Sequence, residues 1–420
     1  MSLSTTIQLR FPALASREFR IFWIGQFVSL IGSWMQNTTQ PLLAYRISGR
    51  PFDLGLIGFA ATLPTLLLAI PGGVLIEHLD KRKTVIAMQS LMMLQAFTLA
   101  FLTLTGVVQI WHIIVLALVL GVATSLEITA RQAMLIELVG REALPNAIAL
   151  QTTIFNAARV LGPMMVAPFL LLIGEQGEGW AFLANGTSYL VIIIGLMTVR
   201  PRFKAEVKKL KAPWVAELRE GQRYILQTRS VGLIILMATL VGFFGFPLMQ
   251  QIPVFASEVL RQAGDTSAAV AARNSSLYTF MGIGALVAAL YAASFSHLRR
   301  KGLLMTIGQF TFISGMISMG LVRLPALAMA VILFMGWGMV SQLAMMNTLI
   351  QVQVPDELRG RVFSTYLWAL QGVAPFGSLF IGWMAQNWSV PIAAIVAGCV
   401  CLLGVGTIHL VNPDIRDLVT

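Results

Sequence analysis

Three ionisable side chains lie inside stretches of sequence that are otherwise apolar. Glu127 is the only acid clearly within such a stretch, Arg131 follows four residues later, and Arg159 lies in the next apolar stretch. Residues at i and i+4 share one face of a helix. If a hairpin turns near residue 141, Glu127 and Arg159 lie at depths that differ by only about 3 Å, at a rise of about 1.5 Å per residue. A Glu127–Arg131 or a Glu127–Arg159 contact is therefore feasible.

These charges have two interpretations if the stretches cross a membrane. A charge at the bilayer centre costs about 2.5–3.5 kcal/mol on insertion scales, so it needs a reason. In the first interpretation, Glu127 binds a proton, releases an arginine and changes the balance between inward-facing and outward-facing states. In the second, the ion pair is permanent and holds two neighbouring helices together. The sequence leaves both open.

The composition is that of a membrane protein. The chain has 420 residues, of which 57% are hydrophobic and only 11% are charged, whereas a soluble domain has about 25% charged residues. The same figures exclude a disordered chain, a collagen-like chain and a disulfide scaffold. Twelve stretches are long and apolar enough to cross a bilayer and predict an all-α protein. They are residues 19–46, 54–76, 84–106, 111–134, 145–173, 180–199, 231–257, 272–296, 302–322, 326–350, 362–386 and 389–411.

The basic residues predict how the chain is oriented. The net charge is +11, with 29 Lys and Arg residues. If the N-terminus is cytoplasmic, 22 of these fall in cytoplasmic segments and five in the opposite ones, which fits the excess of positive charge on the cytoplasmic side of membrane proteins. We therefore expect a multi-pass protein of the inner (cytoplasmic) membrane with both termini in the cytoplasm. The basic loops are expected to set this orientation, and a nucleic-acid partner is not expected.

The longest polar segment divides the chain into halves. Residues 200–230 carry nine basic and three acidic residues, and Trp214–Leu226 is predicted to form an amphipathic helix on the inner surface. We therefore predict an N-terminal six-helix bundle over 1–199, a cytoplasmic basic linker over 200–230 and a C-terminal six-helix bundle over 231–420. The basic triplets 81–83 and 299–301 recur at an offset of 218 residues, as expected for two parallel repeats.

The sequence contains no pattern typical of a metal site, of ATP-driven transport or of an enzyme. The four histidines and two cysteines are not spaced as metal ligands, and no phosphate-binding loop indicates ATP-driven transport. No combination of Ser, His and Asp, and no pair of carboxylates, indicates an enzyme. Cys399 and Cys401 are expected to be unpaired residues of the buried core. We therefore expect no catalytic residue, no cofactor and no metal.

Three parts of the chain resemble the major facilitator superfamily. Residues 72–83 are similar to its loop between helices 2 and 3, with Glu77 where Asp is usual, followed by Asp80 and the basic triplet. Residues 127–163 and 354–362 resemble the branch that includes the enterobactin exporter, macrolide efflux proteins and other drug:proton antiporters. The resemblance covers essentially the whole chain. It implies twelve transmembrane helices in two parallel, pseudo-symmetric six-helix bundles, alternating access and export.

The resemblance also implies a role for the loop after the second helix. In the superfamily, the acid of this loop lies beside the start of helix 11, where Arg361 stands in this sequence. A helix N-terminus favours negative charge. The expected conformational latch on the cytoplasmic side consists of Glu77, Asp80, Arg82 and Arg361. The alternative is a carboxylate that only lies at a helix end in the headgroup region.

A substrate cavity is implied between helices 1, 4, 7 and 10, which line it in the superfamily. In helix 1, residues 36–40 are five consecutive polar residues, which should face protein or water rather than lipid. Aromatic and methionine side chains in helices 7 and 10 would make an adaptable apolar surface, with amides to orient a ligand. For each methionine or aromatic side chain, the alternative is helix packing or lipid contact. The predicted cavity residues are Gln36, Asn37, Gln40, Asn156, Phe243, Phe246, Gln250, Trp337, Gln342 and Met346.

We therefore predict a secondary active transporter that exports small hydrophobic or amphipathic molecules, such as drugs or siderophores, coupled to protons. Glu127, Arg131 and Arg159 are the expected proton-coupling residues. The expected partners are a small-molecule substrate, protons and the lipid bilayer, and the expected state is a monomer. The alternatives are a lipid or metabolite transporter of other direction or coupling, and a transport-inactive sensor on the same fold.

Overall fold

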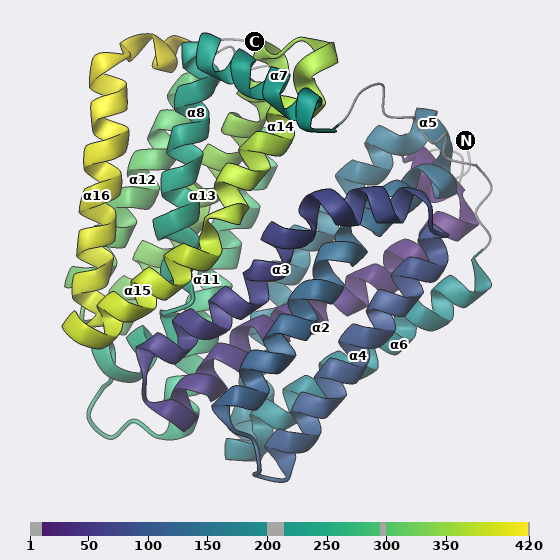
Figure 1. The fold of residues 1–420 in the computed structure, drawn as a ribbon. Helices are drawn as coiled ribbons and strands as arrows, with labels where there is room; N and C mark the ends of the chain where they lie inside the picture. Colours follow the sequence, from purple (N-terminus) through teal and green to yellow (C-terminus); the bar gives the residue numbers. More distant parts are fainter. Residues whose placement is uncertain (1–10, 200–213, 295–299, 419–420) are drawn as a thin grey trace, which may run out of the picture. The chain divides into compact units, whose positions relative to one another are not determined.

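The protein is all-α, as the sequence predicts. The computed structural model describes residues 11–199, 214–294 and 300–418, which form helices joined by short connections (Figure 1). Within these residues, ten helical segments are long and apolar enough to cross a membrane. They are Pro51–Leu68, Lys81–Leu104, Ile110–Leu170, Gly177–Thr198, Arg229–Met249, Ser267–Ala292, Lys301–Leu321, Pro325–Gln353, Glu357–Trp388 and Val390–Val411.

Two features explain why ten segments stand where twelve were expected. The fourth and fifth predicted stretches form one element, α5 (Ile110–Ile173), which Gly140 interrupts with a φ of 75° and a ψ of 175°. A positive φ is readily adopted only by glycine. The first predicted stretch is helical, as α2 (Arg17–Ser48), but it contains the polar run 36–40 and is not among the ten. A twelve-helix arrangement therefore stays a prediction.

The remaining helices follow the predicted stretches closely. Two of the stretches contain π-helical turns, which are frequent at functional sites. Turns η3 (Val241–Gly245) and η4 (Phe255–Val259) begin in the seventh stretch, and η5 (Trp368–Gly372) lies in the eleventh. The elements before the linker are η1 (Pro12–Ala15), α3 (Pro51–Glu77), α4 (Lys81–Leu104), η2 (Gly174–Gln176) and α6 (Gly177–Thr198). The elements after it are α8 (Arg229–Leu240), η3 (Val241–Gly245), α9 (Phe246–Met249), α10 (Ile252–Val254), η4 (Phe255–Val259), α11 (Ser267–Ser294), α12 (Lys301–Leu321), α13 (Pro325–Gln353), α14 (Asp356–Leu367), η5 (Trp368–Gly372), α15 (Ala374–Trp388), α16 (Val390–Val411) and η6 (Pro413–Asp417).

The chain forms two compact units, whose boundaries differ from the predicted ones in two places. The first unit comprises Met1–Leu43 and Leu63–Lys208, and the second comprises Ala44–Thr62 and Lys209–Thr420. The segment Ala44–Thr62, which we call the 44–62 hairpin, thus belongs with the second unit although it lies early in the sequence. The linker helix belongs there too.

In the first unit, α2 and the part of α5 after Gly140 run side by side in the same direction. Trp23 donates from Nε1 to the carbonyl of Leu150 at 3.1 Å. Further along, Gly162 lies against Trp34, because a Cβ atom at this glycine would stand 2.4 Å from the Cβ of Trp34. Glycine is therefore required at position 162 for α5 to approach α2 this closely.

In the second unit, α11 and α13 are packed backbone to backbone. A Cβ atom at Gly284 would lie 1.9 Å from the carbonyl oxygen of Leu333, and one at Gly336 would lie 2.1 Å from that of Met281. Small residues at such positions let helices approach closely in a membrane. The two glycines are therefore a specific requirement of this helix pair.

The 44–62 hairpin contacts other parts of the second unit through polar groups and backbone. Tyr45 donates its hydroxyl hydrogen to Glu258 of η4, and Gln251 donates from Nε2 to the carbonyl of Pro51 at 3.3 Å. A Cβ atom at Gly55 would stand 2.4 Å from the carbonyl oxygen of Ser378 in α15. The helices that enter and leave this hairpin each contain a proline close to its ends, Pro41 in α2 and Pro64 in α3.

The predicted linker helix is present as α7 (Trp214–Gln227). It packs on the second unit, where Tyr224 donates its hydroxyl hydrogen to the carbonyl of Gln353 at 2.9 Å and Glu220 pairs with Arg361 of α14. Leu226 of the predicted apolar face is 86% exposed. The helix therefore presents apolar surface to its surroundings at one end, as expected for a helix at a membrane surface.

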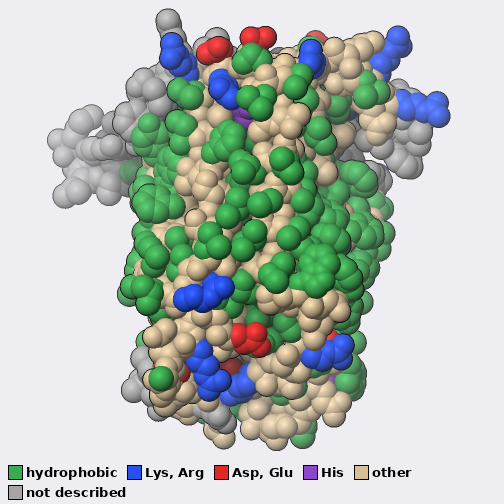
Figure 2. Space-filling view, turned by 90° about the vertical axis from the view of Figure 1, so that its left-hand side faces the viewer, with side chains coloured by type: hydrophobic (Ala, Val, Ile, Leu, Met, Phe, Trp, Pro, Cys, Tyr) green, Lys and Arg blue, Asp and Glu red, His purple; other side chains and the backbone are tan. Residues whose placement is uncertain are grey.

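The surface of the second unit fits a lipid environment. On the side that carries α16, hydrophobic side chains cover the middle, and charged side chains gather toward the two ends (Figure 2). Leu403 and Leu410 of α16 are 70% and 79% exposed. A continuous apolar surface of this kind is unsuited to water and indicates contact with lipid.

Candidate functional site

Glu127 is buried in the first unit and hydrogen-bonded from two helices. Only 4% of the surface of Glu127 is exposed to solvent. Arg131 donates from Nε to Glu127 Oε1 at 3.0 Å, and Gln89 of α4 donates from Nε2 to the same oxygen at 3.2 Å. Ser29 of α2 donates to Oε1 of Gln89 at 3.3 Å. The carboxylate is thus connected to α2, α4 and α5, and of the two contacts expected from the sequence the Glu127–Arg131 contact is present.

Four polar side chains of α2 continue this network along one face of the helix. We call Ser29, Ser33, Gln36 and Gln40 the α2 polar face, because their spacing of three to four residues places them on one side. Gln36 donates from Nε2 to Gln95 and to Gln40, each at 3.0 Å. Both glutamines of this face are buried, and they therefore lie against neighbouring helices of the first unit.

Helix α6 provides the other partners of the α2 polar face. Asn185 donates from Nδ2 to Gln36 Oε1 at 2.7 Å, and the hydroxyl groups of Ser33 and Tyr189 are 3.0 Å apart. A hydrogen bond between helices satisfies polar groups that would be costly against lipid. The first unit is consequently held together by polar contacts as well as by packing.

These partners were missed in the sequence, although a signal for them exists. Gln89, Gln95, Asn185 and Tyr189 are polar or amphipathic residues within stretches that are otherwise apolar. Such residues seek a partner on another helix in a membrane. Matching them with the polar run of the first stretch could have predicted contacts of α2 with α4 and α6.

Arg159 lies apart from Glu127. Its guanidinium carbon is 5.0 Å from the ring centre of Trp34 and 5.4 Å from that of Phe155. Glu127 is linked through Gln89 to Ser29, whereas Arg159 stands over Trp34, five residues further along α2. The expected Glu127–Arg159 contact is not formed among the described residues.

Aromatic contact compensates only part of the cost of burying Arg159. A cation–π contact contributes about 0.5–2 kcal/mol, whereas an arginine at mid-bilayer costs about 2.5–3.5 kcal/mol on insertion scales. The buried Nε of Arg159 has no hydrogen-bond partner in the part of the chain that the structure describes. Arg159 therefore differs from Arg131, which is paired with a carboxylate.

The predicted cavity residues occupy different environments within their own units. Gln342 and Met346 of α13 are fully buried, and neither amide atom of Gln342 has a hydrogen-bond partner within the described residues. Asn37 is exposed, and Asn156 is buried, with Nδ2 donating to the carbonyl of Thr152 at 2.9 Å. The half-buried members are Phe243, Phe246, Gln250 and Trp337. Gln36, Gln40, Gln342 and Met346 thus pack between helices of their own units, and their role in a substrate cavity stays a prediction.

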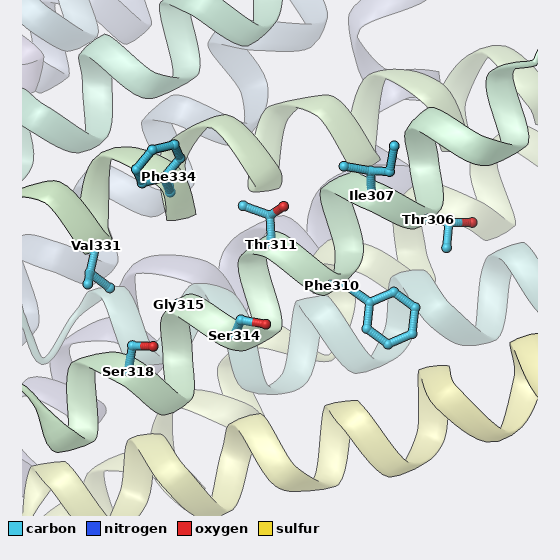
Figure 3. Close-up of a pocket in the computed structure, with 9 residues that line it drawn as sticks. All are labelled: Thr306, Ile307, Phe310, Thr311, Ser314, Gly315, Ser318, Val331 and Phe334. Carbon is cyan, nitrogen blue, oxygen red and sulfur yellow. The ribbon is translucent and has the colours of Figure 1, made fainter.

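A pocket of 550 Å³ lies on α12 and α13, away from the predicted cavity residues. Figure 3 shows that Phe310, Thr311, Ser314 and Ser318 come from one helix and Val331 and Phe334 from its neighbour. Phe334 is 59% exposed. The pocket is therefore a hollow at the surface of the second unit, and none of its lining residues is one of the predicted cavity residues.

The latch residues have local partners in the structure. Asp80 Oδ1 accepts from the backbone N–H of Lys83 at 2.9 Å and so caps the start of α4. Arg82 donates to the carbonyls of Leu196 and Met197 at the end of α6, at 2.7 and 2.8 Å. The side chain of Glu77 lies outside the described residues. Asp80 and Arg82 therefore stabilise helix ends within the first unit, and the latch stays a prediction.

Replacing Arg82 by Gln is expected to destabilise the first unit by about 1–2 kcal/mol, because two charge-assisted hydrogen bonds at a helix C-terminus are lost. Thermal unfolding of the purified protein measures this change. Lys81→Gln, which removes the adjacent charge, is the control and is expected to have a smaller effect. Equal melting temperatures for Arg82→Gln and the unchanged protein would show that the two contacts do not contribute.

Metal and cysteine chemistry find no support in the structure. Within the described ranges, no three His, Cys, Asp or Glu side chains form a group that could hold a metal ion. Cys401 is buried as expected, but Cys399 is exposed, and both are free thiols. The expectation of a buried residue was wrong for Cys399, because side chains two positions apart on a helix point in different directions.

Comparison with known families decides which class of protein these helices form. Residues 9–417 match the family described as transmembrane secretion effectors, a branch of the major facilitator superfamily. The chain belongs to this family. The resemblance recognised in the sequence is thereby confirmed, over nearly the whole chain.

Relatives of this major facilitator protein include transport proteins of enteric bacteria. The enterobactin exporter EntS of Shigella flexneri is 24% identical over 397 residues, which cover 93% of this chain and 90% of the relative. EntS of Escherichia coli O139:H28 is 25% identical over 399 residues, covering 93% and 91%. The family and these relatives consist of transporters and not of enzymes.

Solved transporters share the fold. The nucleoside transporter NupG superposes with a TM-score of 0.73 at 9% identity, covering 94% of this chain and 98% of the other. A D-xylose–proton symporter gives a TM-score of 0.68 at 14% identity, covering 91% and 97%. At such identities the likeness concerns the fold alone. This major facilitator protein is thus a multi-pass membrane protein of the transporter class.

Proposed function

We propose that this protein exports small hydrophobic or amphipathic molecules in exchange for protons, by alternating access of two six-helix halves. The observation that carries the proposal is the environment of Glu127. A carboxylate at 4% exposure accepts hydrogen bonds from α4 and α5 and, through Gln89, is connected to α2. Export as the direction is supported by the 25% identical EntS relatives, which are exporters.

The contacts of Glu127 define what a proton would change. When its carboxylate is ionised, it pairs with Arg131 and accepts from Gln89. Protonation removes the negative charge, weakens both hydrogen bonds and leaves Arg131 without its counter-ion. The relative positions of α2, α4 and α5 can then change, and a ligand that prefers one arrangement shifts the balance between the two states.

The function is tested with purified protein in liposomes, a panel of anionic, neutral and cationic amphipathic dyes, and pH gradients imposed in both directions. With an acidic interior, protons leave through the transporter, and at least one dye is expected to enter faster than in protein-free liposomes. The reversed gradient is expected to remove this acceleration. Dye movement in the same direction as protons contradicts proton antiport, and so does a rate of dye movement that is the same with and without the pH gradient. No movement of any dye supports a transport-inactive sensor instead.

A further inference from the structure

Arg159 is a charged side chain within an apolar helix of the first unit, and the proposed proton coupling through Glu127 and Arg131 does not use it. Its guanidinium lies against the faces of Trp34 and Phe155. It makes no ion pair or hydrogen bond within the described residues, and its buried Nε has no acceptor. Contact with ring faces leaves the N–H donors at the edge of the guanidinium available. Arg159 thus has an uncompensated charge and unused donors.

The surroundings of Arg159 are fixed by packing. Gly162, one helical turn further along α5, lies against Trp34 so closely that a Cβ atom there would stand 2.4 Å from the Cβ of Trp34 and 2.8 Å from the carbonyl oxygen of Ile31. The rings of Trp34 and Phe155 are 5.6 Å apart at an interplanar angle of 70°. The two rings therefore form a rigid corner around the guanidinium.

This corner is open on one side. Phe155 is 40% exposed, and Asn37, one turn beyond Trp34 on α2, is exposed as well.

Arg159 stands 19 residues beyond Gly140 and 14 residues before Ile173, about 28 and 21 Å from the two ends of this arm. Since the hydrocarbon core of a bilayer is about 30 Å thick, a lipid headgroup does not reach this depth. An anionic molecule that enters through this open side would supply the missing counter-ion.

We infer that Arg159 binds the acidic group of an aromatic, anionic amphipathic substrate, whose ring system stacks on Trp34 and Phe155. The planar guanidinium can hold both oxygens of a carboxylate in a two-pronged hydrogen bond. The inference rests on the proposed transport function, since it names the class of molecule carried. It also gives the two arginines different roles: Arg131 pairs with Glu127, and Arg159 binds the substrate.

The test compares two fluorescent probes that differ in one group, 1-pyrenebutyrate and 1-pyrenebutanol. Binding to purified protein in lipid nanodiscs is measured at equilibrium, without any gradient, with protein-free nanodiscs subtracted. The unchanged protein is expected to bind the carboxylate about tenfold or more tightly than the alcohol, as for a charge-assisted hydrogen bond in a partly buried site. Arg159→Gln is expected to bring the two affinities within about twofold of each other.

Two further variants keep the test decisive. Arg159→Lys retains the charge but not the planar fork, so the preference for the carboxylate is expected to fall severalfold and not to vanish. Arg223→Gln removes a charge from the exposed face of α7 and is expected to leave the preference unchanged. Equal affinities of the unchanged protein for the two probes, or an unaltered preference in both Arg159 variants, overturns the inference. If Arg159→Gln does not fold, Arg159→Lys alone decides the matter.

The binding test and the liposome test together distinguish a failure of this inference from a failure of the proposed transport function. A preference for the carboxylate that depends on Arg159, found together with no dye movement in liposomes, rejects the exporter and keeps the anion site. Dye movement driven by a pH gradient, without any such preference, keeps the exporter and rejects the anion site.

Discussion

Replacing Glu127 by Gln is expected to remove the dependence of transport on a pH gradient while leaving the fold intact. Glutamine has the shape of a protonated carboxyl group, so the protein is held permanently in the proton-bound condition. Gradient-driven transport is expected to fall by about tenfold or more, because the variant no longer gains or loses a charge at a site where charge is costly. Dye transport in liposomes with and without an imposed gradient measures the effect.

Two variants separate the proton role of Glu127 from a structural one. Glu127→Asp keeps a titratable carboxylate and is expected to retain the gradient dependence, although a shorter side chain weakens the contact with Arg131. Asp53→Asn removes another buried carboxylate, in the first turn of α3, and is expected to leave the gradient dependence unchanged. A folded Glu127→Gln protein with the full response to the gradient would identify the ion pair as a permanent link between helices.

A large loss of stability is expected from adding one methyl group at Gly336. Its Cβ atom would stand 2.1 Å from the carbonyl oxygen of Met281, and a helical backbone oxygen cannot rotate away as a side chain can. Helices α11 and α13 must therefore separate, and overpacking of this kind costs about 1–3 kcal/mol. Thermal unfolding of Gly336→Ala in detergent is expected to show a lower melting temperature and more aggregation during purification.

Gly406→Ala is the matched control. Gly406 lies within α16 of the same unit, and nothing stands within 4 Å of the position that its Cβ would take. Alanine favours a helix over glycine by up to about 1 kcal/mol, so this variant is expected to be as stable as the unchanged protein or more so. Equal melting temperatures for the two alanine variants would show that the α11–α13 contact tolerates a wider separation.

Much of the helical content could be predicted because it depends on local patterns. Apolar runs of about 20 residues are sufficient to identify spanning helices, and the linker helix was predicted at Trp214–Leu226 and lies at Trp214–Gln227. The contact of Glu127 with Arg131 also follows from spacing along a single helix. These predictions needed no knowledge of which helices are neighbours.

The features that were missed all depend on contacts between distant segments. The positions of Gln89 and Asn185 beside α2, and of Trp34 beside Arg159, are set by helix packing that a hydropathy pattern does not encode. The hairpin near residue 141 is present at Gly140, but spacing along the chain gives only the depth of Arg159 and not the direction in which its side chain points, which is toward Trp34 and Phe155. The place of the 44–62 hairpin in the second unit had no signal in the apolar pattern.

The prolines at the ends of the 44–62 hairpin have a mechanical consequence. The first unit ends and the second begins between Leu43 and Ala44 in α2, and the reverse occurs between Thr62 and Leu63 in α3. Pro41 and Pro64 stand within three residues of these two crossings, and a proline inside a helix removes a backbone hydrogen bond and lowers the resistance to bending. Both helices are therefore easier to bend close to the points where the chain passes from one unit to the other.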